Sequence, residues 1–393
     1  MLYPRTLLKT LEKHISTREI VVLTGMRRVG KTTLFLLLFE KIPSNNKVFI
    51  DLENPLDQRI FEEDKYINIL ANLKECGLNL KGKMYVFLDG IQAKPEAVKA
   101  IKYLYDHYKI KFFLSGSSSF HVKNLFPESL LGKKFVFELF PLAFEEFLLF
   151  KDKNGKFGPS LGQQDKNKNQ HFYESTRKFY DEYLEYGGFP EVVLAEETKD
   201  KILKLKDIFK SYFEKDVKNL ADFSKINCFR DLILLLAQRD GEKLDISRLS
   251  SEIGVSRITI YTYLEFLKET YFIRLVSPLS RNVNKEISGT KKVYFCDHGM
   301  ANLFAKIDEE RLFENCVFNN LIKFGKINYY QKRNGTGIDF ILNERIGIEV
   351  KVKGFESNLI KLDKICKKIS LDEAYVISNE YVEKDHFIPA TDI

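Results

Sequence analysis

The sequence predicts an α/β protein of more than one domain, in which a parallel sheet comes first, a helical region follows, and a second, smaller α/β domain ends the chain. Between residues 19 and 124, short β-rich apolar runs alternate with longer helical stretches, which is typical of parallel strands joined by crossover helices. Residues 172–223 carry aromatic and charged residues at helical spacing, and β-rich runs return after residue 292. A chain of 393 residues has room for two or three domains, since one domain usually takes about 100 to 200 residues.

The first domain is expected over residues 1–150. Its predicted strands are Ile20 to Thr24, Val48 to Leu52, Tyr85 to Asp89 and Phe112 to Ser115. Each run is rich in β-branched or aromatic residues, and a longer stretch with helical character follows it. A carboxylate at the end of one parallel strand can therefore reach a loop that follows a neighbouring strand.

A phosphate-binding loop follows the first of these strands. The segment GMRRVGKT matches the pattern G-x-x-x-x-G-K-[ST], and it lies between a strand and a helix-forming stretch. The two glycines let backbone N–H groups surround a β-phosphate, and the N-terminus of the helix adds positive potential. Lys31 is expected to contact the β- and γ-phosphates, and Thr32 to offer its hydroxyl to Mg²⁺. The residues expected to bind nucleotide are Gly25, Arg27, Arg28, Val29, Gly30, Lys31, Thr32 and Thr33.

The carboxylate that such a site needs stands at the end of the third predicted strand. Asp89 ends the run MYVFLD and is expected in the magnesium shell. Gly90 follows it, where many ATPases have a glutamate that positions the attacking water. Gln92 or Glu53 could take over this role, provided that the side chain lies within hydrogen-bond reach of the water; otherwise hydrolysis is expected to be slow or absent. The assigned catalytic residues are Lys31, Asp89 and Gln92.

The fourth predicted strand runs into a serine-rich stretch, FFLSGSSS at residues 112–119. Its hydroxyls, with Ser115 and Ser117 as the assigned sensor residues, could respond to the γ-phosphate of a bound nucleotide. A serine-rich turn without such a role is the alternative, because Ser and Gly are common in turns.

Composition bounds the class of protein and its location. Hydrophobic residues make up 44% and charged residues 30% of the chain, as in ordinary globular proteins. The net charge of +7 permits contact with nucleic acid or an acidic membrane surface but is too small to demonstrate either. The five cysteines form no CxxC pair, and no apolar run approaches the roughly 20 residues that a membrane span needs. We therefore expect a cytoplasmic protein with no membrane partner.

The middle of the chain predicts a linker and then helices. Residues 151–170 are rich in Lys, Asn, Gly and Gln and lack an apolar period, so we expect a mobile loop or insertion there. Residues 171–283 are expected to form a helical and winged helix-turn-helix region. Its second half predicts helices at residues 230 and following, at 246–253 and from Ser256, and then a strand at 271–276.

A winged helix suggests a DNA partner. Near the start of its last helix the predicted DNA-reading residues are Ser256, Arg257, Thr259 and Ile260. The predicted phosphate contacts are Lys243, Arg248, Lys268 and Arg281. The alternative is that the winged helix packs on the ATPase core as a lid or a dimer element, since fold does not fix function.

The last region, residues 284–393, holds a pattern of carboxylates and one lysine. Glu314 stands on a predicted helix, Asp339 at the start of a strand, and Glu349 and Lys351 two residues apart on the next strand. Strand alternation puts the last two on one face, where Asp339 and Glu349 could hold Mg²⁺ and Lys351 could steady a hydroxide or leaving oxygen. The pattern resembles the restriction-endonuclease-like, PD-(D/E)xK core. Solvated charges at a strand edge, or a DNA-gripping domain without cleavage, are the alternatives.

Motifs along nearly the whole chain resemble those of a large group of prokaryotic AAA-like ATPases that carry a C-terminal domain of unknown function. They are YPR at 3–5, TGMRRVGKTT at 24–33, FLDGIQ at 87–92, FLSGSSS at 113–119, PLAFEEF at 141–147, EYGGFPEVV at 185–193, SYFEKDV at 211–217, VYFCDHG at 293–299, ENCVFNNL at 314–321, DFIL at 339–342 and IEVK at 348–351. The resemblance implies ATP as the nucleotide. Two positions depart from the family pattern: Gly90 replaces a glutamate, and Lys133 replaces an arginine that normally follows Leu-Leu-Gly.

Three functional hypotheses follow. The preferred one is an AAA-like ATPase whose ATP state controls a winged-helix and nuclease-like half that engages DNA. The second is a switch that binds ATP without hydrolysing it and sets the assembly state of a homo-oligomer or of a complex with another protein, and Gly90 favours it. The third is a metal-dependent nuclease that is gated by nucleotide.

Overall fold

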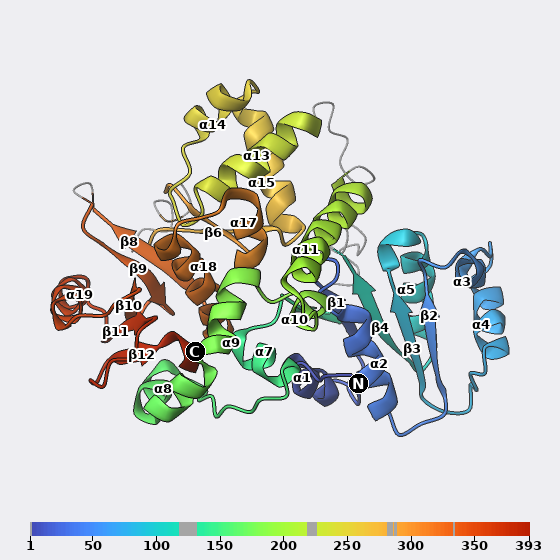
Figure 1. Ribbon diagram of the computed structural model, residues 1–393. Coiled ribbons are helices and arrows are strands. Elements are labelled where there is room, and N and C mark those ends of the chain that lie inside the picture. The colour runs from blue at the N-terminus through green and yellow to red at the C-terminus, as the bar shows by residue number, and fades with distance from the viewer. Residues whose placement is uncertain (1, 118–131, 218–225, 281–285, 287–288, 333–334) are drawn as a thin grey trace. The chain divides into compact units, whose positions relative to one another are not determined.

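The computed structural model describes residues 2–117, 132–217, 226–280, 286, 289–332 and 335–393 (Figure 1). It divides into two compact units. The first unit consists of Met1–Phe140 together with Glu269–Tyr271, and the second unit consists of Pro141–Lys268 together with Phe272–Ile393.

The first unit is built on a sheet of five parallel strands in the order β2-β3-β4-β1-β5. The strands are β1 Ile20–Thr24, β2 Lys47–Asp51, β3 Met84–Asp89, β4 Ile110–Gly116 and β5 Lys134–Glu138. The predicted parallel α/β sheet is thus confirmed. The sequence did not indicate β5, an edge strand whose residues are exposed or only partly buried.

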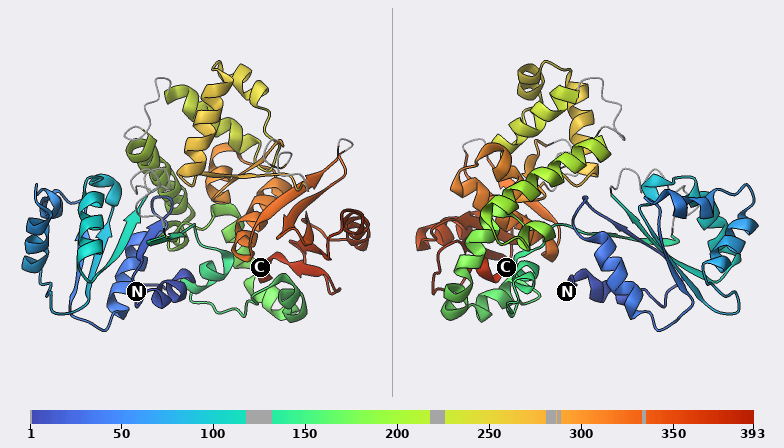
Figure 2. Two further views of the ribbon diagram at one scale, coloured as in Figure 1. Left: turned by 180° about the vertical axis from the view of Figure 1, so that it is seen from behind. Right: turned by 45° about the vertical axis from the view of Figure 1, so that its right-hand side comes forward.

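Helices cover both faces of this sheet (Figure 2). They are α1 Leu7–Lys13, α2 Lys31–Lys41, α3 Pro55–Gln58, α4 Tyr66–Glu75 and α5 Ala97–His107. On one face, apolar residues of α4 and α5 join alternate residues of the strands in one buried cluster. On the other face, Phe35 of α2 packs edge-on against Phe87 and Phe113, with ring centroids 5.4 and 6.2 Å apart. Burial on both faces explains why these strands read as continuous apolar runs.

The second unit begins with helices. They are α7 Phe144–Phe150, α8 Leu161–Asn167, α9 Gln170–Tyr186, α10 Pro190–Val193 and α11 Thr198–Tyr212, and a π-helical turn follows at Phe213–Val217. The segment 151–170, expected to be a mobile loop or insertion, therefore contains a helix. Ser160 caps α8 by accepting from the N–H of Gln163, and the side chains of Leu161 and Gln164 are buried. The cap and this burial stabilise a helix in a stretch of polar composition.

Three helices and a strand follow in the order that the sequence predicts, and a second strand pairs with the first in an antiparallel sheet. They are α13 Ile226–Gln238, α14 Ile246–Ile253, α15 Arg257–Glu269, β6 Ile273–Val276 and β7 Lys292–Phe295. The strand expected after residue 292 is present, but its expected place at the opening of the last α/β domain was wrong. In the structure β7 pairs with β6, because the partner of a strand is chosen by tertiary contacts rather than by its own composition.

The chain ends in a second five-stranded sheet, in the order β12-β11-β10-β9-β8. Its elements are α17 His298–Ala305, α18 Glu309–Leu321, β8 Ile327–Gln331, β9 Gly337–Leu342, β10 Ile346–Lys351, α19 Glu356–Ile369, β11 Glu373–Ser378 and β12 Phe387–Pro389. The strands β8, β9 and β10 are antiparallel neighbours, whereas β10, β11 and β12 run parallel. The crossover from β10 to β11 is α19.

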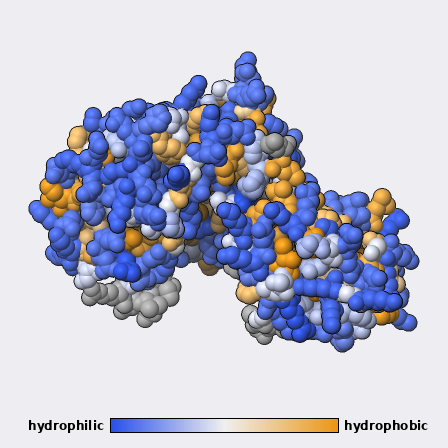
Figure 3. Space-filling model, turned by 90° about the horizontal axis from the view of Figure 1, so that it is seen from below, coloured by the Kyte–Doolittle hydropathy of each residue, from blue (hydrophilic) through white to orange (hydrophobic). Residues whose placement is uncertain are grey.

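The surface seen in Figure 3 is mostly hydrophilic, with hydrophobic residues in small scattered groups. Such scattered groups are ordinary on globular proteins. Among the helices in the described ranges, none combines the length and the apolar character that crossing a bilayer requires.

Candidate nucleotide-binding site

The loop between β1 and α2 lies at the carboxyl edge of the first sheet. Its backbone has positive φ at Gly25 (149°), Arg28 (67°) and Gly30 (94°), and Gly30 immediately precedes α2. A side chain at position 25 would overlap with the carbonyl of Leu139, so this glycine is required by space as well as by conformation. The loop therefore curls so that main-chain N–H groups and the start of α2 face one small region.

The ammonium group of Lys31 lies over this loop. Its Nζ donates to the carbonyl oxygens of Gly25 at 2.8 Å and of Met26 at 2.9 Å. These contacts hold the positive charge within the region that the main-chain N–H groups surround. The arrangement suits a group of several negative oxygens.

A buried arginine to which no role was assigned from the sequence holds the phosphate-binding loop in place. Arg5 is 6% exposed, and its guanidinium donates to the carbonyl oxygens of Val29 and Phe140, both at 2.8 Å. Val29 belongs to the loop, and Phe140 follows β5. The only sequence signal was the YPR motif at residues 3–5, whose contact partners are far away in the chain.

The structure brings Asp89 and Thr32 together at the same edge of the sheet. Thr32 Oγ1 donates to Asp89 Oδ2 at 2.5 Å. Ser115 Oγ donates to the other carboxylate oxygen of Asp89 and accepts from the N–H of Gly90 at 3.1 Å. Ser115, assigned as a sensor of the γ-phosphate, is thus a buried partner of the carboxylate.

A second carboxylate fills the space beside Gly90. Gly90 has φ of 76°, and a Cβ atom there would lie 2.9 Å from Cγ of Glu53. The Glu53 carboxylate accepts from Gln92 Nε2 at 3.1 Å and from Arg27 Nη1 at 3.0 Å. Gln92 Oε1 in turn accepts from the N–H of Ser117 at 3.2 Å. Glu53 and Gln92, the two alternatives that the sequence left open, therefore lie in one network with the loop residue Arg27.

One position at which the sequence departs from the family pattern does not lie in this site. Lys133, which stands where the family pattern has arginine, precedes β5 and pairs with Asp106 at 2.7 Å. Both lie at the opposite edge of the sheet, where the strands begin. Ser118, Ser119, Leu130 and Leu131 lie outside the described residues.

The carboxylates predicted near the end of the chain also form a cluster, within the second unit. Lys351 Nζ lies 2.8 Å from Glu349 Oε1 and 3.8 Å from Asp339 Oδ2. Glu314 accepts from Tyr294 at 2.5 Å and pairs with Lys292 at 3.0 Å. Burial and then the neighbouring charge of Glu349 raise the pKa of Asp339, and burial and then Asp339 raise the pKa of Glu314.

The lysine of this cluster is held in its charged form. Burial by itself would lower the pKa of Lys351, but the adjoining Asp339 and Glu349 carboxylates outweigh it and raise that pKa. Among the described residues, no three His, Cys, Asp or Glu side chains are arranged to hold a metal ion. A cation between Asp339 and Glu349 would therefore have to displace the ammonium of Lys351.

One of the residues predicted to read DNA from α15 does not lie on the exposed face of this helix. Ile260 is fully buried, because the helix turns that position toward the core. The side chains that stand out are Ile258, 78% exposed, and Tyr261, 60% exposed.

The predicted phosphate contacts are also changed by their surroundings. Arg248 pairs with Glu252 at 2.9 Å and Lys268 with Glu265 at 2.6 Å, so neighbouring carboxylates compensate both charges. Lys243 Nζ lies 5.6 Å from the centre of the Tyr329 ring. Arg281 lies outside the described residues.

Comparisons with known proteins give two family matches. Residues 17–148 match the family model of a AAA domain, and residues 177–311 match a domain of unknown function, DUF8612. The first match supports an ATP-binding, AAA-like P-loop domain, as the motifs of the first domain predict. Neither match bears on DNA binding or cleavage.

Similar proteins are found among curated sequences and solved structures. Uncharacterized protein MJ1544 of Methanocaldococcus jannaschii is 28% identical over 392 residues, covering 92% of this chain and 84% of that protein. An uncharacterized protein of Haemophilus influenzae is 23% identical over 394 residues, covering 95% and 94%. AMPPCP-bound DnaA from Aquifex aeolicus aligns with 67% of this chain and 86% of that chain at 14% identity, with a TM-score of 0.28, which is too low to support an argument.

Proposed function

We propose that the first unit binds ATP with Mg²⁺ and hydrolyses it, and that the nucleotide state controls how the second unit engages a partner. The observation that carries the proposal is the convergence of Lys31, the curled loop and the Thr32–Asp89 pair at one edge of the sheet. A hydroxyl and a carboxylate oxygen 2.5 Å apart form a donor set that suits Mg²⁺. Thr32 and Asp89 would hold the ion, which when bound neutralises charge on the triphosphate.

Glu53 is the group that we assign to the attacking water. Its side chain occupies the space that a residue larger than glycine at position 90 would enter, next to Asp89. A carboxylate there can accept a proton from a water molecule while the water oxygen attacks the γ-phosphorus. The bond from that phosphorus to the β,γ-bridging oxygen then breaks, and ADP and phosphate leave. Gln92 donates to Glu53 and so orients it.

Arg27 competes for the same carboxylate. Its guanidinium lies 3.0 Å from Glu53 Oε1, and the Arg27 side chain is 15% exposed. A triphosphate in the loop offers Arg27 a second anionic partner. Transfer of Arg27 to the triphosphate would release Glu53 for the water, so that hydrolysis follows binding.

The test is phosphate release from Mg-ATP, measured together with nucleotide affinity. In Lys31→Ala, ATP binding should weaken about 10- to 100-fold, since a charged hydrogen-bond donor is lost. In Glu53→Gln, affinity should be kept while turnover falls about 10²- to 10⁴-fold. The matched control is Glu40→Gln, which changes an exposed carboxylate on α2 and should alter neither quantity. Turnover of the unaltered protein no higher than that of Lys31→Ala would support the switch that binds ATP without hydrolysing it.

DNA is the partner that we propose for the second unit, and the order of its last elements supports this. The order α18, β8, β9, β10, α19, β11 places a helix, three antiparallel strands, a crossover helix and a parallel strand around Asp339, Glu349 and Lys351. This is the order expected for a restriction-endonuclease-like core. Because Lys351 bridges the two carboxylates, DNA binding has more support than cleavage.

Two assays separate these roles. Binding of a short DNA duplex, followed by fluorescence anisotropy, should weaken steeply as salt rises and should weaken further in Tyr261→Ala. Nicking of plasmid with Mg²⁺ or Mn²⁺ tests cleavage, which must disappear in Asp339→Ala and Lys351→Ala. No DNA binding even at low salt would leave a protein partner or a homo-oligomer as the target of the switch.

A further inference from the structure

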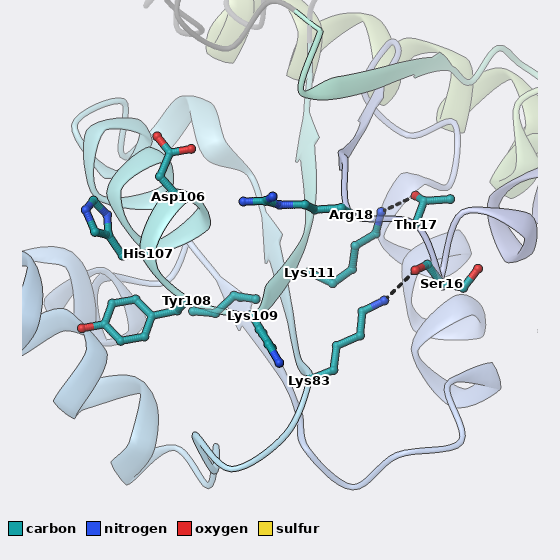
Figure 4. Close-up of a pocket in the computed structure, with 10 residues that line it drawn as sticks. Ser16, Thr17, Arg18, Lys83, Asp106, His107, Tyr108, Lys109 and Lys111 are labelled. Atoms are coloured by element: carbon teal, nitrogen blue, oxygen red, sulfur yellow. Dashed lines mark hydrogen bonds between the residues drawn. The ribbon is translucent and has the colours of Figure 1, made fainter.

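A cavity of about 470 Å³ opens at the edge of the first sheet opposite to the nucleotide site (Figure 4). Parallel strands all begin at this edge, and a basic residue stands at or just before the start of each one. These residues are Arg18 before β1, Lys47 at β2, Lys83 before β3, Lys109 before β4 and Lys133 before β5.

Two of these cations have partners elsewhere. Lys47 donates to the carbonyl oxygens of Phe39 and Ile42 at 2.7 and 2.9 Å, and Lys133 pairs with Asp106. The others line the cavity together with Lys111, the second residue of β4.

The deepest of the cavity's cations is Lys111, which is 1% exposed. Its Nζ donates to Thr17 Oγ1 at 3.0 Å and to the carbonyl of Glu19. Lys83 Nζ reaches the same turn and donates to the carbonyls of Ser16 at 2.9 Å and Ile15 at 3.1 Å (Figure 4). An ammonium group has three N–H bonds, so each lysine keeps one for a further acceptor.

The charges of this cavity are not balanced. Four cations line it, Arg18, Lys83, Lys109 and Lys111, against the single carboxylate of Asp106, which Lys133 already neutralises. Among the described residues, no carboxylate lies within ion-pair distance of Lys83 or Lys111. Burial and then the charge of Lys83 lower the pKa of Lys111 to about 8, and the Glu19 carboxylate offsets only part of this shift. Neutral hydrogen-bond donors would be enough to hold the turn at residues 15–19, so this structural role does not explain why two charged lysines lie side by side.

We propose that this cavity binds a terminal phosphate group, whose two negative charges match the ammonium groups of Lys83 and Lys111 in its lining. The cavity volume is in the range of small-molecule sites. A terminal phosphate can enter a cavity of this size, which Lys111 lines, whereas an internal phosphodiester carries one charge and is flanked by chain on both sides. The ligand is therefore a phosphorylated small molecule or the phosphorylated end of a nucleic acid.

Pyrophosphate is the probe, and the Lys31→Ala protein is the background, because binding at the phosphate-binding loop is weakened in it. Calorimetry at low salt should show one site. Lys83→Met should weaken it at least about tenfold, since one charge-assisted hydrogen bond is lost, and Lys111→Gln should do the same. Lys81→Ala, an exposed lysine of the same edge outside the cavity, is the matched control and should bind normally. Circular dichroism checks that each variant is folded.

The two sources of phosphate are separated by competition. An oligonucleotide with a 5′-phosphate, but not its unphosphorylated form, should displace pyrophosphate if the ligand is a nucleic-acid end. No displacement assigns the site to a phosphorylated small molecule. No heat in the Lys31→Ala protein, or equal affinity in Lys83→Met, would overturn the proposal. Neither result affects ATP binding at the loop, which is read from the unaltered protein.

Discussion

Replacement of Arg5 by methionine is expected to lower the stability of the first unit and its nucleotide affinity at the same time. The Arg5 guanidinium is almost fully buried, and it donates to the carbonyls of Val29 and Phe140, both at 2.8 Å. It therefore joins the phosphate-binding loop to the segment that follows β5. Methionine has a similar length and an apolar stem but no donor, so both carbonyls would lose a partner.

The magnitude follows from these two bonds. A hydrogen bond to a charged group contributes about 1.5 to 3 kcal/mol, so the pair accounts for about 3 to 6 kcal/mol. Burial of the methionine side chain offsets part of this loss, and we expect the free energy of unfolding to fall by about 3 to 4 kcal/mol. A loop that loses its anchor also misplaces its amides, and a shift of about 1 Å can reduce function by about 100-fold. ATP affinity should therefore fall by about 10- to 100-fold.

Urea unfolding followed by circular dichroism measures the first quantity, and titration with a fluorescent ATP analogue measures the second. Arg5→Lys should give an intermediate loss, because one ammonium cannot span two carbonyls as a planar guanidinium does. The control is Arg59→Met, an exposed arginine that should stay within about 0.5 kcal/mol of the unaltered protein. A loss below about 1 kcal/mol in Arg5→Met, with an unchanged dependence on urea, would refute this reasoning.

Three further predictions can be tested with single variants. Gly25→Ala should abolish nucleotide binding and lower the melting temperature, since the added methyl overlaps with the Leu139 carbonyl. Gly90→Glu should not raise ATP turnover, because φ of 76° and the nearby Glu53 leave no room for a second carboxylate; a rise would contradict the role of Glu53. Burial lowers the pKa of His298 from 6.5 to about 4. The stability that depends on a neutral His298 is therefore fully present above pH 6.5 and is lost as the pH falls through 4. In His298→Gln this pH dependence should be absent. The free energy of unfolding of the unaltered protein should therefore fall by up to about 3 kcal/mol more than that of the variant between pH 6.5 and pH 4.

Much of the first unit could be predicted from the sequence because its signals are local. Strands buried on both faces read as apolar runs, and the loop motif between β1 and α2 sets its own backbone conformation. The contact between Glu53 and Gly90 could not be predicted, since it depends on which strands are neighbours: β2 and β3 pair directly, so the residues that follow them meet at one edge. The anchor of Arg5 depends on the same tertiary proximity.

The second unit was harder to predict because its structure depends on which segments contact one another, and local sequence patterns do not reveal this. The strand β7 has the composition of many strands, and only its pairing with β6 assigns it to the two-stranded sheet. Ile260 follows a helical period whose phase depends on where α15 begins, and a start at Arg257 turns that residue inward. The carboxylates Glu314, Asp339 and Glu349 were predicted as a group, but the bridging position of Lys351 needed coordinates.

The composition of the first unit has a practical consequence for dissecting the molecule. Glu269–Tyr271 belong to it although the chain on both sides belongs to the second unit, and the Tyr271 hydroxyl donates to Glu138 at 3.1 Å while its ring packs edge-on against Phe140. The backbone thus passes between the units at three places. No single cut can separate them cleanly. A gene fragment that ends at residue 140 would encode an ATPase domain that lacks Tyr271, one of its own packing residues.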